Sequence, residues 1–109
     1  MLIDIVNYIP EGCEHAISRR NLCIATGLND RVVRELIEEA RRTTIIISNT
    51  DGSGYWLYPE TPTQKEIHLL NRYVKQQERR AKSIFYALKP ARKKIQAIEK
   101  GGGTDGGRN

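Results

Sequence analysis

The segment Leu22–Leu36, "LCIATGLNDRVVREL", decides the fold, because its pattern predicts two helices separated by one tight turn. Ser18 is the predicted N-cap of the first helix, and Gly27 supplies the positive-φ residue that ends it. Asn29 is the predicted cap of the next helix. The buried face of that helix is predicted by apolar residues spaced i, i+3, i+4, i+7, namely Val33, Leu36, Ile37 and Ala40.

The chain on the amino-terminal side of this segment predicts a short additional helix. Leu2, Ile5, Val6 and Ile9 recur at helical spacing and stop at Pro10, so we expect a helix over residues 2–8. The following "EGCEH" is expected to be a loop. In the helix after Ser18, the residues expected to face inward are Leu22, Cys23 and Ile24.

After the second predicted helix the pattern changes to that of a β-hairpin. "TTIIIS" (43–48) is β-branched and "YWLY" (55–58) is aromatic, with Asp51-Gly52 and Gly54 between them. The consecutive isoleucines do not alternate with polar residues, so both faces of the hairpin need cover. We expect Tyr55 and Leu57 to face the helices, and Trp56 and Tyr58 to face a later long helix. A phosphate-binding glycine loop runs from a strand into a helix, whereas this one joins two strands.

A long basic helix is predicted to follow. Thr63 and Glu66 form a capping box, and Pro90 interrupts the helix, so we expect helices over about 62–88 and 90–99. A heptad seam runs along them through Ile67, Leu70, Val74, Gln77, Ala81, Ile84, Leu88, Ala91, Ile95 and Ile98. The seam either pairs with a second copy or folds over the hairpin. We expect its first half to pack on Ile46, Trp56 and Tyr58, and its second half to meet a partner.

The order helix, helix, tight turn, helix, hairpin predicts an α+β, mainly α fold, a winged helix-turn-helix followed by a long basic carboxyl-terminal helix. Cys23, Gly27, Asn29, Val33 and Leu36 occupy the positions at which a helix-turn-helix needs a small residue, a turn glycine, a cap and docking side chains. The expected divisions are 1–60 for the winged domain, 61–99 for the basic helix and 100–109 for a disordered tail.

Three stretches carry a resemblance to a known family: "ISRRNLCIATGLNDRVVRELIEEAR", the wing "DGSGYWL" and the basic "RRAKSIFYALKPARK". Over roughly residues 1–95 the chain resembles small winged-helix proteins of phages and prophages of Gram-positive bacteria. The resemblance implies DNA binding, in transcription regulation or in the initiation of DNA replication. It also implies the cytoplasm of a bacterial host cell.

Charge along the 109 residues is strongly uneven. Residues 1–62 contain six basic and nine acidic side chains, whereas residues 63–100 contain eleven basic and three acidic ones. An anionic partner is therefore expected, with most of the attraction in the carboxyl-terminal third. No apolar run approaches the ~20 residues that cross a bilayer, so we expect a soluble protein with no membrane partner.

Catalytic and metal-binding patterns are absent from the sequence. Cys13, His15 and Cys23 offer three ligands at no familiar zinc spacing, and structural use is the favoured interpretation. His68 is expected at the surface. No nucleophile is paired with a base, so we predict a protein that is not an enzyme and that carries no metal or other cofactor.

If the chain binds double-stranded DNA, its third helix enters the major groove. Arg31 and Arg34 are the candidates for base contact, with Asn29 close to the groove and Arg41 and Arg42 on phosphates. The alternative is that these arginines form i, i+4 ion pairs on a solvated helix. Further phosphate contacts are expected from two sets of residues: Ser18, Arg19 and Arg20 at a helix start, and Arg79, Arg80 and Lys82 on the long helix.

A second hypothesis is a protein-interaction module. Here the winged domain is a scaffold, and the basic heptad helix dimerises or binds a replication or regulatory protein through Ile67, Leu70, Val74, Ile84 and Leu88. Asp51 at the predicted wing tip favours this hypothesis, since a wing that grips DNA is expected to carry Lys or Arg there.

Overall fold

The computed structural model describes residues 3–49 and 52–101, and it is an α+β, mainly helical structure with one two-stranded antiparallel sheet. Two compact units divide the chain after Tyr73. We call the described residues of the first unit the head and those of the second unit the arm. The division lies within a helix, so the first turns of that helix belong to the head.

The amino-terminal helix is shorter than the sequence predicts. Only Ile5–Tyr8 (η1) is helical, as a 3-10 turn whose cap, Asp4, accepts a hydrogen bond from the Val6 N–H at 3.1 Å. The carboxyl-terminal limit set by Pro10 is confirmed, and Leu2 lies outside the described residues. The predicted loop "EGCEH" contains a second 3-10 turn, Cys13–His15 (η2).

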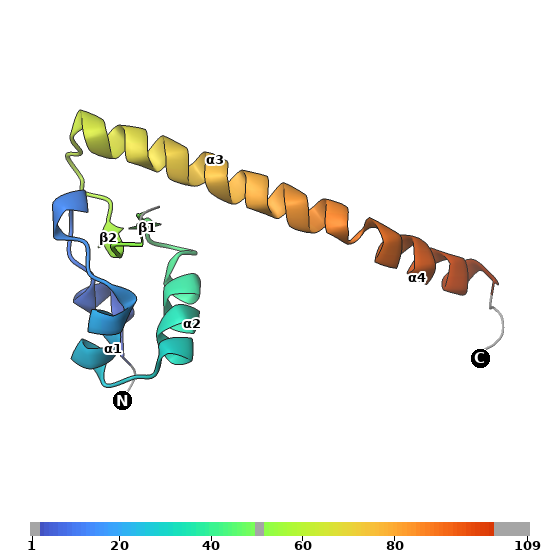
Figure 1. The fold of residues 1–109 in the computed structure, drawn as a ribbon, viewed down its shortest axis with the longest axis horizontal. Helices are drawn as coiled ribbons and strands as arrows, with labels where there is room; N and C mark the ends of the chain where they lie inside the picture. The colour runs from blue at the N-terminus through green and yellow to red at the C-terminus, as the bar shows by residue number, and fades with distance from the viewer. Residues whose placement is uncertain (1–2, 50–51, 102–109) are drawn as a thin grey trace. The chain divides into compact units, whose positions relative to one another are not determined.

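The decisive segment forms two capped helices, α1 (Arg19–Thr26) and α2 (Asp30–Ala40), which lie side by side (Figure 1). The Ser18 hydroxyl accepts from the Asn21 N–H at 3.1 Å, and the Asn29 side chain accepts from the Val32 N–H at 2.9 Å. Gly27 follows α1 with φ +76°, the left-handed conformation that glycine adopts without strain. The predicted caps and turn are therefore confirmed.

The core of the head confirms most of the predicted inward face. Leu22, Val33 and Ile37 are buried and pack with Ile5, Ile9 and Ile46. Cys23, Leu36 and Ala40 are partly buried against this cluster. Ile24 was expected to face inward, and that prediction is wrong: it is 70% exposed, because one hundred degrees of helical rotation per residue carries it past the face that holds Leu22.

The hairpin consists of β1 (Ile46–Ser48) and β2 (Tyr55–Leu57), paired with Ile47 opposite Trp56. Ile46 and Ile47 are both buried, which confirms that both faces of the strand are covered. Tyr55 and Leu57 pack against the helical core as predicted. The turn residues Thr50 and Asp51 lie outside the described residues, so the acidic tip expected at Asp51 remains a prediction.

A second edge of β2 also pairs with the chain before α1. Ile17 and Tyr55 exchange two backbone hydrogen bonds of 2.9 and 2.8 Å, and the Gly12 N–H donates to the Leu57 carbonyl at 3.0 Å. The hairpin is thereby fixed to the segment that leads into α1, which sets the position of the helix pair relative to the strands.

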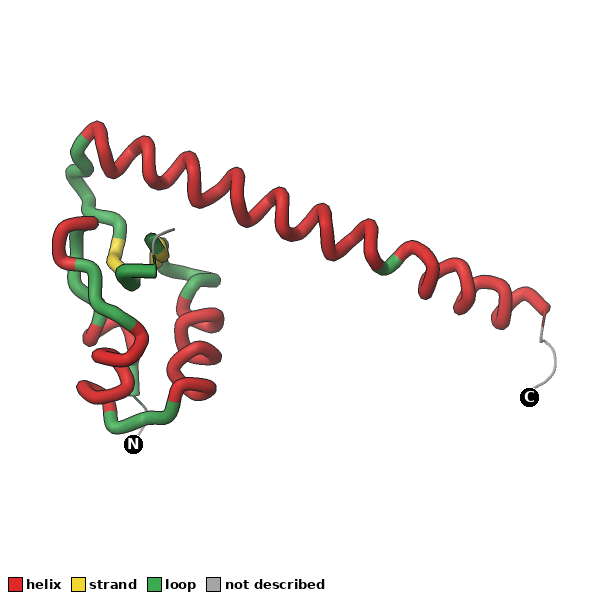
Figure 2. The backbone as a smooth tube through the Cα atoms, in the orientation of Figure 1, coloured by secondary structure: helices red, strands yellow, loops and turns green. Residues whose placement is uncertain are grey.

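The basic region forms α3 (Gln64–Ala87) and α4 (Lys89–Gly101), and Figure 2 shows the interruption between them at Leu88. The helix bounds and the break beside Pro90 agree with the prediction to within two residues. The capping box is confirmed, since the Glu66 N–H donates to the Thr63 hydroxyl at 3.1 Å and the Thr63 N–H donates to Glu66 at 2.9 Å. Lys100 and Gly101 extend α4, and the rest of the predicted tail lies outside the described residues.

Candidate nucleic-acid interface

The start of α1 presents two exposed arginines beside free helix N–H groups. Arg19 forms an ion pair with Asp30, the first residue of α2, and donates at 3.5 Å to the Tyr55 hydroxyl. These two partners, Tyr55 first and then Asp30, raise the pKa of Arg19, which stays charged. Arg20 is exposed and has no ion pair within the described residues. Arg19 thus ties α1 to α2 and β2, and Arg20 is the cation left available to an anion.

The outer face of α2 carries the two arginines predicted to contact bases. The Arg31 side chain is 83% exposed and lies 3.8 Å from Glu35, and that of Arg34 is 61% exposed and lies 3.6 Å from Asp30. Exposed ion pairs of this kind contribute about 0.2–1 kcal/mol to stability, so each arginine can leave its carboxylate for a ligand at little cost. Asn29, between the helices, is engaged as the cap of α2.

Arg41 and Arg42 were predicted together as phosphate contacts, and the structure separates them. The Arg42 side chain is 76% exposed, and among the described residues its one ion pair is with Glu39. That of Arg41 is 19% exposed, donates to the Ile46 carbonyl at 3.0 Å and to the Ser48 hydroxyl at 3.4 Å, and pairs with Glu38. Its guanidinium also lies 5.2 Å from the ring centroid of Tyr73. Arg41 is therefore a structural link between α2, β1 and α3, and Arg42 is the one positioned to reach a ligand.

Burial raises the pKa of the Tyr73 hydroxyl, with Arg41 opposing that rise. Tyr73 therefore stays neutral beside the guanidinium at physiological pH. Its half-buried ring and the cation above it hold the first turns of α3 on the head.

Glu66 is a buried carboxylate that sequence reasoning identified only as a helix cap. It is 5% exposed, and besides Thr63 it accepts a hydrogen bond from the Cys13 N–H at 2.9 Å. The N–H groups of Thr63 and then Cys13 lower the pKa of Glu66. Burial, and next the Glu66 carboxylate, raise the pKa of the Cys13 thiol. This contact joins residues 53 positions apart, and nothing in the local pattern could have indicated it.

The predicted packing of the seam on the hairpin is partly wrong. Ile67 and Val74 are 37% and 43% exposed, and Ile46 belongs to the helical core and not to a surface facing α3. The inward side of the first turns consists instead of Glu66, Leu69, Leu70 and Tyr73, which are buried or half-buried. The heptad pattern identifies only Leu70 of this side, because it includes neither the capping carboxylate nor the tyrosine.

The arm leaves its cations and the second half of the seam exposed. Arg79, Arg80 and Lys82 are exposed, and no Lys or Arg between residues 74 and 101 forms an ion pair in the described structure. Ile84 and Leu88 are 55% and 44% exposed. The arm therefore presents positive charge and apolar side chains together.

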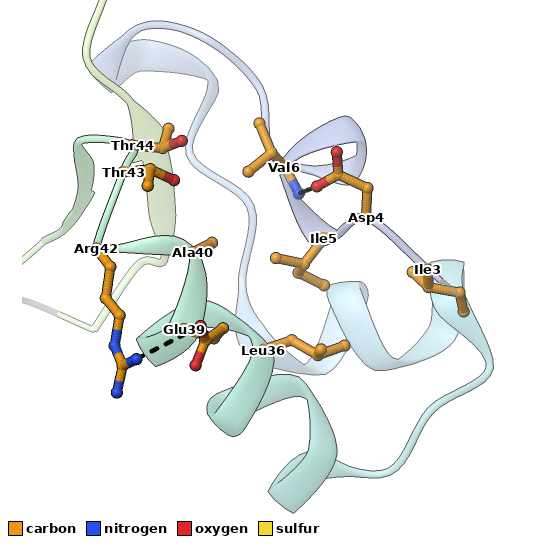
Figure 3. A pocket seen from close by; sticks show the side chains of 10 residues that line it. All are labelled: Ile3, Asp4, Ile5, Val6, Leu36, Glu39, Ala40, Arg42, Thr43 and Thr44. Atoms are coloured by element: carbon orange, nitrogen blue, oxygen red, sulfur yellow. Dashed lines mark hydrogen bonds and ion pairs between the residues drawn. The ribbon is translucent and has the colours of Figure 1, made fainter. Parts of the chain in front are cut away.

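A cavity of about 470 Å³ opens in the head between η1 and the end of α2 (Figure 3). Its lining is apolar at Ile5, Val6 and Leu36, and an ion pair between Glu39 and Arg42 lies at its edge. The polar part of its lining also includes Asp4, Thr43 and Thr44.

The residues considered as metal ligands are dispersed. Cys23 packs against the core, whereas His15 and His68 are exposed. Across the parts of the chain that the structure describes, no cluster of three or more histidine, cysteine or carboxylate side chains could hold a metal ion. Within the same parts, none of the helices combines the length and the apolar character needed to span a membrane.

No family model, curated protein or solved structure matches this chain.

Proposed function

We propose that the chain is a DNA-binding protein whose head acts as a winged helix-turn-helix on duplex DNA. The observation that carries this proposal is the arrangement of Arg19–Leu57: two capped helices joined through Gly27, then a hairpin whose second strand also pairs with Ile17 ahead of α1. A winged helix-turn-helix requires this order of elements, with the second helix of the pair free to enter the major groove.

On this proposal α2 reads the bases. Arg31 and Arg34 lie on its exposed face near its start, and arginine is the commonest side chain that contacts guanine in the major groove. The first helix meets the DNA backbone through Arg20 and the N–H groups at its start. Arg79, Arg80 and Lys82 add attraction to phosphate that does not depend on sequence.

A role in phage transcription regulation or in the initiation of replication is part of the proposal. It is supported by the resemblance to small phage and prophage winged-helix proteins that the sequence carries in "LCIATGLNDRVVREL" and "DGSGYWL". The location of the target site separates these roles, since a regulator acts at promoters and an initiator acts at origins.

Random-site selection with the full chain, followed by affinity measurements on the selected duplex, tests the proposal. Arg31→Ala and Arg34→Ala should each weaken binding to the selected site about tenfold and relax its preference at one or two positions. Arg72→Ala, on α3, removes the same charge outside this face and is the matched control. If both α2 variants bind every duplex as the wild type does, the assignment of α2 to the groove is wrong.

A second candidate function is a protein-interaction module, favoured by the exposure of Ile84, Leu88, Ile95 and Ile98 on the arm. Light scattering over a range of concentrations tests it. A dimer held by the seam should lose mass when Ile84 and Leu88 are both changed to Lys, and Lys75→Glu, which changes a charge without touching the seam, should leave the mass unchanged. A wild type that stays monomeric contradicts pairing of the seam with a second copy.

A further inference from the structure

The carboxyl-terminal end of α3 exposes two adjacent aromatic rings. Phe85 and Tyr86 are 51% and 54% exposed, and their rings meet edge to face with centroids 6.0 Å apart. Apolar side chains of this size are normally buried in a core or against a partner. About half of each side chain therefore remains free to contact a ligand.

A cation lies close to each ring. The Lys89 ammonium lies 4.7 Å from the centroid of Tyr86, and the Arg92 guanidinium lies 5.3 Å from that of Phe85. On the side toward the start of α3, the rings line an open hollow together with Lys75, Arg79 and Lys82. Lys75, Arg79, Lys82 and Tyr86 follow one another at intervals of three or four, so they share a face of α3, and Phe85 lies beside that face. We call Lys75, Arg79, Lys82, Phe85, Tyr86, Lys89 and Arg92 the aromatic-cationic face.

The charge of the arm decides what kind of ligand this face fits. Residues 74–101 contain nine basic and two acidic side chains, and one of the acidic ones, Glu78, also lines the hollow. A second copy of the arm would bring the same positive charge against it. A polyanion would instead be attracted, and its binding would release counterions.

We propose that the aromatic-cationic face binds single-stranded nucleic acid, with Phe85 and Tyr86 stacking on unpaired bases and the neighbouring cations holding phosphates. Proteins that bind single strands without sequence preference combine a basic surface with aromatic side chains in this way. A duplex keeps its base faces stacked inside the helix, so exposed rings gain nothing from it beyond the charge attraction. The proposal goes beyond the duplex-reading role of the head, which uses other residues.

The cations above the rings are compatible with stacking. Each aromatic ring has two faces, and a cation on one face leaves the other open to a base. Lys89 and Arg92 can therefore hold the rings in place and reach a phosphate from the same position. The half-exposed rings retain the free surface that stacking requires.

Fluorescence anisotropy with labelled strands of about 20 nucleotides, oligo-dT and oligo-U, tests the proposal alongside an unrelated duplex of equal length. The variant F85A/Y86A keeps every charge, and alanine preserves the helix, which circular dichroism verifies. It should bind a single strand at least about tenfold more weakly. Its affinity for the duplex should stay within about twofold, and its salt dependence should be unchanged.

The matched control is Ile84→Ala/Ile95→Ala, which removes comparable apolar volume from arm positions that do not line the hollow. It should bind single strands as the wild type does, and Tyr86→Phe, which keeps the ring, should do the same. Preference for oligo-dT or for oligo-U identifies the natural ligand as DNA or RNA, and either supports the proposal.

Four results would overturn it: no measurable binding to either strand, unchanged single-strand affinity of F85A/Y86A, an equal loss for the control pair, or an equal loss for the duplex. Unchanged single-strand affinity together with a lower mass in light scattering would show that the face binds protein. The proposed reading of duplex DNA by α2 stands or falls separately, since Arg31→Ala and Arg34→Ala leave the aromatic-cationic face intact.

Discussion

Replacing Gly54 by alanine tests the packing of the hairpin on the segment that precedes α1. Gly54 is buried at φ +134°, and an added Cβ would overlap the Ile17 carbonyl and lie 2.8 Å from the Ser18 nitrogen. Both are backbone atoms, so no side-chain rotation relieves the overlap. Because Tyr55 is the next residue, the strain falls on its two hydrogen bonds with Ile17.

Gly52 provides the matched control for the magnitude. It also has positive φ, +80°, but no atom lies within 4 Å of an added Cβ. Gly52→Ala should therefore cost only the backbone penalty, about 1–2 kcal/mol. Gly54→Ala carries a similar penalty and also breaks two hydrogen bonds worth about 1 kcal/mol each, so we expect a loss of about 3–4 kcal/mol. This is a large part of the ~5–15 kcal/mol that stabilises a typical domain.

Urea unfolding followed by the fluorescence of Trp56 measures the difference. Trp56 is the single tryptophan, is fully buried and lies in β2, so its emission reports the head and not the helical arm. With a slope of about 1–3 kcal/mol per molar urea, Gly54→Ala should unfold at a urea concentration at least about 0.5 M below that of Gly52→Ala. Equal midpoints for the two variants would refute the close approach of Gly54 to Ile17.

Three further changes test other contacts of the structure. Glu66→Gln should cost about 1–3 kcal/mol at pH 7, whereas Glu60→Gln, at an exposed site, should cost almost nothing. Hydrogen bonds lower the pKa of Glu66, so its carboxylate stabilises the fold above the ordinary pKa of 4.5, and this contribution is lost as the pH falls through the lowered value. If the urea midpoints of the wild type and Glu66→Gln differ equally at pH 7 and pH 3, this explanation is wrong. Arg41→Ala should lower the free energy of unfolding by about 1–3 kcal/mol and Arg42→Ala by less than about 0.5 kcal/mol, and equal losses would show that Arg41 is not a structural link. Pro90→Ala restores a backbone N–H at the start of α4, so far-UV circular dichroism should show more helix, and an unchanged spectrum would place the cause of the break elsewhere.

The features that could be predicted from the sequence are those with local causes. The Ser18 and Asn29 caps, the turn at Gly27 and the capping box at Thr63 all involve partners within five residues, and each is present. The amino-terminal helix was overestimated because Ile5 and Ile9 both reach the core although Ile9 lies beyond η1 in extended backbone, so their spacing does not require an α-helix.

The features that could not be predicted depend on partners far along the chain. Ile17 pairs with Tyr55 and Glu66 caps a turn at Cys13, and neither contact leaves a local pattern. The same distinction between local and distant partners applies to the arginines of the candidate interface. Exposure of Arg31 and Arg34 follows from the helical period, whereas the burial of Arg41 depends on where β1 and Tyr73 lie.

The distribution of charge has a consequence for how affinity and specificity would divide between the two units. Helix α2 carries four carboxylates and two arginines, so its approach to a polyanion is opposed even though its arginines suit base edges. The arm carries nine cations and no ion pair among its described residues, so its charge favours any polyanion. If the proposed function holds, the arm supplies most of the affinity and its salt dependence, and α2 supplies the discrimination. Changing Arg79, Arg80 and Lys82 should then lower affinity for all duplexes alike, while changing Arg31 should alter the ranking of sites, because phosphates are the same at every position and base edges are not.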